Sequence, residues 1–214
     1  MSDFKTIALA LDAHLSEKYS TVTVTDDTWW VVVGNLMVKA VTIAIPWIRA
    51  IVDTLDEEHS TRSVTLPVPG GEGALIVYSS AAVADGLQYC ITATHEHEHA
   101  RVLKTQPDLE VLVDYACAEL RSASEGRAYS CGAFTRYLLT GEFQSADEIV
   151  NPLNHGYMLD QGDVDFARSM VMSDLASMRH GAVPPHELCQ VVLKILQANF
   201  PDAIRPLAFQ VQGH

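Results

Sequence analysis

After a helical stretch over residues 3–18, the hydrophobic pattern of this chain is mainly that of strands up to about residue 80 and that of helices beyond it. Before that point, short runs alternate β-branched and polar residues, as in Thr21–Thr25, which is typical of strands. After it, apolar residues recur at intervals of three and four, which is typical of helices that pack on a core. Strands gathered in one part of the chain and helices in the other predict an α+β fold rather than a doubly wound sheet.

The expected elements follow from this pattern. We expect strands at 21–25, 63–68 and 74–79, a hairpin from 29–33 and 36–45, and helices over 3–18, 47–55, 83–104, 108–140, 163–180 and 185–199. The glycine-rich segment 69–73 matches no phosphate-binding loop and is predicted to be a hairpin turn. The sequence therefore predicts one domain over 1–214, β-rich over 20–80 and α-rich over 81–214. A small N-terminal antiparallel sheet would pack on the mainly helical C-terminal part.

Composition restricts the function classes. The 214 residues include 48% hydrophobic ones, enough to bury a sizeable core. The 27 Asp and Glu outnumber the 14 Lys and Arg, giving a net charge of −13. Nucleic acids and anionic membrane surfaces are bound by clusters of Lys and Arg, and the sequence has none. We therefore expect no nucleic-acid partner.

Two further features of the sequence bear on the cellular compartment of the protein. The four Cys are scattered and form no CxxC pair, and the N-terminus lacks a signal-peptide pattern. Both features predict a cytoplasmic protein with reduced thiols. Trp29–Ile48 is about long enough to span a bilayer. However, Asn35 and Lys39 lie inside this segment, and a central Lys is costly in lipid, so we expect no membrane span.

The segment with the clearest chemistry is His95-Glu96-x-x-His99, an HExxH pattern. Four residues advance about 6 Å along a helix and return to nearly the same face, so both imidazoles can reach one zinc ion. Glu96 would point about 100° around the helix, toward a water on the metal rather than the metal itself. A carboxylate there can accept the proton of that water.

A solvated face is the competing interpretation of the alternating run His-Glu-His-Glu-His at 95–99. Only one register supplies two His at the required spacing, because the residue four after His97 is Arg101. We expect His97 and Glu98 to be such surface residues, pointing away from the metal. The apolar residues before the motif favour a buried helix.

A catalytic zinc needs a third protein ligand, and the candidates downstream are Asp114, Glu119, Glu125 and more distant His residues. Ser122-Ala123-Ser124 is expected to bend or interrupt the helix over 108–140, and Glu125 is favoured because it would then start a helical stretch. It also precedes Gly126, Ala128 and Gly132, small residues that would let its helix approach the HExxH helix. The alternatives are Glu119 as the ligand, or Glu125 as part of a capping box with Ser122.

These two segments together resemble zinc metallopeptidases. An HExxH helix followed 26 residues later by a Glu on another helix is similar to the gluzincin branch. More narrowly, residues 92–99 with 124–129 resemble predicted metallopeptidases of phages and bacteria, in which a HEHxH helix precedes a Glu-x-x-Ala-Tyr segment. The resemblance covers roughly residues 60–145. No third His follows His99 in the metzincin manner.

The resemblance implies a zincin-like fold in which His95, His99 and Glu125 bind zinc and Glu96 is the general base. It also implies that strand 74–79 is an edge strand along which an extended peptide is bound. Many gluzincins carry an Asp four residues after the third ligand to hydrogen-bond a ligand His, but this chain has Tyr129 there.

The sequence thus predicts a zinc-dependent peptidase acting on a peptide or protein substrate. A tetrahedral intermediate usually needs a hydrogen-bond donor besides zinc, and Tyr129, His155 and Tyr157 are the candidates. The alternative is a protein without turnover. It would be a zinc-binding or metal-free structural or interaction protein, of the kind that phages encode.

Overall fold

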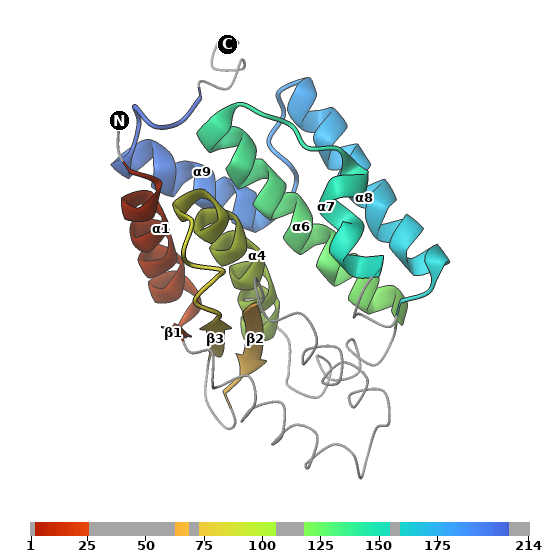
Figure 1. The fold of residues 1–214 in the computed structure, drawn as a ribbon, viewed down its shortest axis with the longest axis horizontal. Helices are drawn as coiled ribbons and strands as arrows, with labels where there is room; N and C mark the ends of the chain where they lie inside the picture. The colour runs from red at the N-terminus through yellow and green to blue at the C-terminus, as the bar shows by residue number, and fades with distance from the viewer. Residues whose placement is uncertain (1–2, 26–62, 69–72, 106–117, 155–158, 206–214) are drawn as a thin grey trace.

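The computed structural model describes residues 3–25, 63–68, 73–105, 118–154 and 159–205, which form a helical body with a small sheet at one end (Figure 1). The elements are α1 (Phe4–Tyr19), β1 (Thr21–Thr25), β2 (Ser63–Pro67), β3 (Ala74–Tyr78), α4 (Gly86–Thr105), α6 (Ala118–Thr140), α7 (Ala146–Val150), the 3-10 helix η1 (Asn151–Asn154), α8 (Gln161–Arg179) and α9 (Glu187–Asn199). The predicted α+β class is confirmed. The expected hairpin at 29–45 and helix at 47–55 lie outside the described residues.

The sheet differs from the prediction in the direction of one strand. Its order is β1-β3-β2, and β2 pairs with β3 in antiparallel fashion, as a hairpin requires. The β1 strand instead runs parallel to β3, so the expected all-antiparallel sheet is wrong. An alternating pattern shows which face of a strand is buried but not its direction. The long segment between the two strands, residues 26–73, permits the crossover that a parallel pair needs.

The helix α4 lies between α1 and α6, and β2 and β3 pack against it as well (Figure 1). Asp85 is the N-cap of α4, because its carboxylate accepts a hydrogen bond from the backbone N–H of Gln88 at 2.8 Å. Gly132 on α6 allows close packing, since a Cβ there would lie 3.1 Å from Cγ2 of Ile91 on α4. Gly126 faces Ala167 on α8 instead, so only part of the expected small-residue contact with α4 is present.

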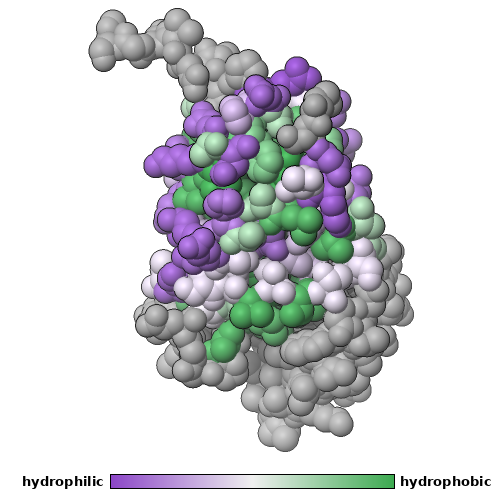
Figure 2. Space-filling view, turned by 90° about the vertical axis from the view of Figure 1, so that its left-hand side faces the viewer, coloured by the Kyte–Doolittle hydropathy of each residue, from purple (hydrophilic) through white to green (hydrophobic). Residues whose placement is uncertain are grey.

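The apolar stripes predicted at helical spacing form the core. On α1, Ile7, Leu11 and Leu15 are fully buried, and α9 buries Leu188, Val192 and Leu196 in the same way. The side of the molecule that carries α1 shows hydrophobic and hydrophilic residues interspersed (Figure 2). Among the described residues, no helix is long and apolar enough to cross a membrane, and Trp29–Ile48 lies outside them.

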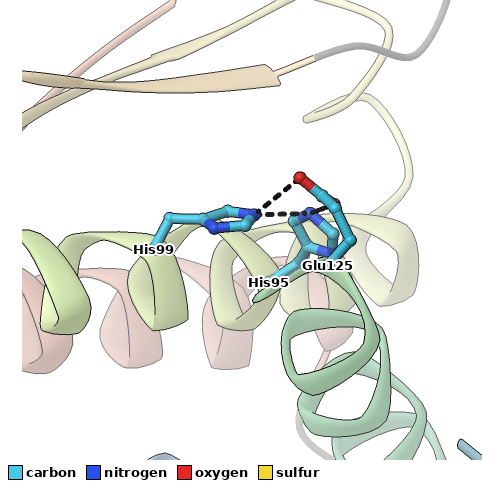
Figure 3. A group of neighbouring side chains, drawn as sticks. All are labelled: His95, His99 and Glu125. Carbon is cyan, nitrogen blue, oxygen red and sulfur yellow. Dashed lines mark hydrogen bonds and ion pairs between the residues drawn. The ribbon is translucent and has the colours of Figure 1, made fainter. Parts of the chain in front are cut away.

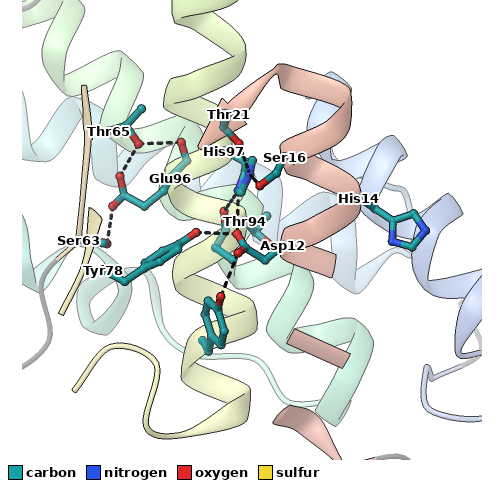
Figure 4. Close-up of polar contacts among 12 residues, drawn as sticks. Asp12, His14, Ser16, Thr21, Ser63, Thr65, Tyr78, Thr94, Glu96 and His97 are labelled. Carbon is teal, nitrogen blue, oxygen red and sulfur yellow. Dashed lines mark hydrogen bonds and ion pairs between the residues drawn. The ribbon is translucent and has the colours of Figure 1, made fainter. Parts of the chain in front are cut away.

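A buried polar network joins α4 to α1 (Figure 4). His97 is fully buried, and its Nε2 lies 3.2 Å from Ser16 Oγ and 3.1 Å from Thr21 Oγ1. Its Nδ1 lies 3.7 Å from Oδ1 of Asp12 on α1. The expectation that His97 is a solvated surface residue is therefore wrong, although it does point away from His95 and His99. Burial, partly opposed by Asp12, lowers the pKa of His97.

Asp12 also accepts hydrogen bonds of 2.9 Å from the hydroxyls of Tyr78 and Tyr89. Replacing Asp12 by Ala leaves two buried hydroxyls without their acceptor, and each unsatisfied group costs about 1–3 kcal/mol. We expect Asp12→Ala to lower the free energy of unfolding by about 3 kcal/mol, and Tyr89→Phe by about 1 kcal/mol, in urea denaturation. In the Asp12→Ala background Tyr89→Phe should cost almost nothing. Equal costs in both backgrounds would contradict the network.

Candidate metal centre

His95 and His99 extend from α4 on the same side, as the four-residue spacing predicts. Their Nε2 atoms are 3.2 Å apart, and the two rings meet edge to face with centroids at 4.9 Å (Figure 3). His99 is buried and His95 is partly exposed. Two imidazole nitrogens directed at one point can share at most one proton between them, so a cation is a better partner for both.

Glu125 reaches the same point from α6. One carboxylate oxygen lies 3.5 Å from His95 Nε2, and the other lies 3.5 Å from His99 Nε2. The side chain is buried, and its Oε2 makes no hydrogen bond among the described residues. Glu125 lies inside α6 rather than at its start, so the sequence argument from helix position is wrong and the capping box with Ser122 is excluded.

These three side chains form a group that can hold a metal ion, with all ligand atoms within 4.8 Å of one another. Tetrahedral zinc with bonds of about 2.0–2.2 Å would place ligand atoms about 3.3–3.6 Å apart, close to the separations of 3.2, 3.5 and 3.5 Å. Within the described part of the chain no fourth Cys, His, Asp or Glu belongs to the group. The donor set therefore fits a zinc with three protein ligands.

The three groups shift one another's proton affinity. Burial acts to lower the pKa of His99, but the Glu125 carboxylate outweighs it and the pKa rises to about 9. Burial acts to raise the pKa of Glu125, but His99 and His95 hold it far below its usual range. Glu125 therefore stays an anion, and it attracts a positive charge to the point between the imidazoles.

Two neighbours on α6 contact the imidazoles from outside the group. Ser124 Oγ lies 3.4 Å from His99 Nδ1, the ring nitrogen that faces away from Glu125. The ring of Tyr129, one helical turn after Glu125, meets the ring of His95 edge to face at 4.6 Å. A hydroxyl and an aromatic edge thus orient the two rings, where many gluzincins use an Asp.

Glu96, the residue after His95, points toward the strand β2. Its carboxylate accepts hydrogen bonds of 2.6 Å from Ser63 Oγ and from Thr65 Oγ1 (Figure 4). It is 4% exposed, so these hydroxyls satisfy a buried charge-bearing group. Neither hydroxyl was expected from the sequence, although Ser63 and Thr65 alternate with Val64 and Leu66 along the strand and therefore share one face.

Glu98 is also buried, contrary to the expectation of a solvated face. Arg101 binds both of its oxygens, at 2.9 and 2.7 Å, and Arg127 of α6 approaches to 3.9 Å. Glu98 therefore connects α4 to α6 beside the metal group. The (i, i+3) spacing of Glu98 and Arg101 was the available sequence signal for this pair.

The structure describes only some of the remaining residues and elements that were predicted to form the site. His155 and Tyr157 lie outside the described residues, so their role stays a prediction, as does that of Asp114. Glu119 belongs to α6, but its side chain is not among the described ones. Strand β3 is the central strand of the sheet, so the expectation that it is an edge strand is wrong.

No protein-family model, curated protein or solved structure matches this chain. The resemblance to gluzincins therefore depends on the HExxH and Glu-x-x-Ala-Tyr segments alone.

Metal binding should release the proton that Glu125 stabilises on His99. Metal ligands must be deprotonated, and the pKa of His99 is raised to about 9. We therefore expect the apparent affinity for Zn²⁺ to rise about tenfold between pH 7 and pH 8, measured by competition with a chromophoric chelator. Glu125→Gln should weaken binding and flatten this dependence, because it removes the carboxylate that raises the pKa. Zinc binding that is independent of pH over this interval would contradict the arrangement.

Proposed function

We propose that this chain is a zinc-dependent peptidase. The observation that carries the proposal is the convergence of His95, His99 and Glu125, two imidazoles and one carboxylate, at tetrahedral spacing. Zinc supplies a Lewis acid that lowers the pKa of water to about 7 and polarises a carbonyl group. A zinc ion held by three protein ligands would keep a fourth position open for water or substrate.

Glu96 is the proposed general base. It follows the ligand His95 in sequence, so it is attached to the same rigid helix as both imidazoles. Its carboxylate accepts the proton of the attacking water and later delivers it to the leaving amine. Of the three residues predicted to donate a hydrogen bond to the developing oxyanion, Tyr129 is the one that the structure describes, and its ring contacts His95.

A non-catalytic metal-binding protein is the second candidate. The observation that favours it is the burial of the group, since Glu125 is 4% and His99 is 5% exposed. A buried metal that substrates cannot reach would stabilise the contact between α4 and α6 without turnover.

Metal content separates a real site from a chance motif. We expect about one zinc per wild-type chain and none retained by His95→Ala after dialysis, measured by atomic emission. His14→Ala is the matched control, because His14 is an exposed residue of α1 away from the group. Equal zinc in wild type and His95→Ala would contradict the site.

The catalytic role is tested by Glu96→Gln, which keeps the size of the side chain and removes its basicity. We expect this variant to keep its zinc but to hydrolyse labelled casein or a peptide mixture about 100- to 10,000-fold more slowly than wild type. Zinc-loaded wild type without hydrolysis of any peptide would favour the non-catalytic candidate instead.

A further inference from the structure

The orientation of Glu96 is set by a strand that is distant in sequence. Ser63 Oγ donates to Oε1 and Thr65 Oγ1 donates to Oε2, each at 2.6 Å, and the Thr65 oxygen also lies 3.0 Å from the Glu96 carbonyl oxygen. Ser63 and Thr65 are two residues apart on β2, so their side chains lie on one face of the sheet. That face is directed at α4 (Figure 4).

The distances identify these as strong hydrogen bonds. An O–H donor to a carboxylate oxygen typically lies at 2.5–2.7 Å, shorter and stronger than a bond between neutral groups. Each oxygen of Glu96 accepts one hydroxyl, so the pair fixes the rotation of the carboxylate as well as its position. A free Glu side chain would instead populate several rotamers, because it has three rotatable bonds.

The two hydroxyls leave capacity for a further partner. A carboxylate has about four lone-pair positions, and Ser63 and Thr65 use one on each oxygen. Glu96 can therefore accept a further hydrogen bond, from a water molecule, while both bonds to β2 remain.

We propose that Ser63 and Thr65 are positioning residues that hold the Glu96 carboxylate in its proton-accepting orientation. This rests on the proposed peptidase function. Helix α4 fixes the backbone of Glu96 relative to His95 and His99, and β2 fixes the end of the side chain. Misplacing a reacting group by about 1 Å can lower a rate about 100-fold, so the hydroxyls affect turnover without touching substrate or metal.

Matched variants separate the hydroxyl from the shape of the side chain. Thr65→Val removes the hydroxyl and keeps the branched shape, whereas Thr65→Ser keeps the hydroxyl. Ser63→Ala and Ser63→Thr form the second pair, and Ser63, being only partly buried, supplies the test should Thr65→Val not fold. We expect Thr65→Val and Ser63→Ala to lower kcat about 10- to 100-fold with little change in KM, and Thr65→Ser and Ser63→Thr to restore it.

A second measurement does not depend on activity. In protein labelled with ¹³C at the Glu carboxyl groups, the Glu96 resonance is assigned by its loss in Glu96→Gln. It should shift in Thr65→Val and Ser63→Ala and return in the hydroxyl-retaining partners, while zinc content stays at the wild-type value in all four variants.

The possible failures differ. An unchanged Glu96 resonance in both Thr65→Val and Ser63→Ala would overturn the positioning proposal. So would a shifted resonance with wild-type kcat, which would mark the contact as purely structural, and neither result would affect the proposed peptidase. Zinc-loaded wild type that hydrolyses neither casein nor peptides would overturn the proposed function, and the positioning role with it.

Discussion

The structure depends on finding hydrogen-bond and ion-pair partners for one stretch of α4 that is polar around its whole circumference. Residues 95–99 of α4 are five consecutive titratable side chains, and only His95 among them is more than slightly exposed. A buried charged or polar group costs several kcal/mol unless it is paired, so each face of α4 requires its own partner. An apolar groove of the usual kind could not cover this helix.

Three neighbours of α4 supply such partners. The α6 helix contributes Glu125 to the imidazoles, β2 contributes two hydroxyls to Glu96, and α1 contributes Asp12 to the face of His97. Because segments from residue 12 to residue 125 converge on one helix, the metal group and the scaffold share the same network.

The sequence predicted the parts of this arrangement that are local. The (i, i+4) spacing of His95 and His99 is a property of one helix, and the structure brings Glu125 to these two residues in a group that could hold a metal ion. The reasons given for Glu125 were partly wrong, because α6 begins at Ala118 and Gly126 faces α8. The partners of Glu96 and His97 and the direction of β1 could not be predicted, since they depend on how distant segments pack.

The two glutamates illustrate how surroundings assign different chemistry to the same side chain. Glu125 faces two imidazoles, which hold it as an anion and direct it at a cation. Glu96 faces two neutral hydroxyls, which fix its geometry but bring no positive charge. A carboxylate between two imidazoles is suited to binding a cation, whereas one that accepts two hydroxyls has its orientation fixed by the strand that supplies them. This division follows from which element covers each face of α4.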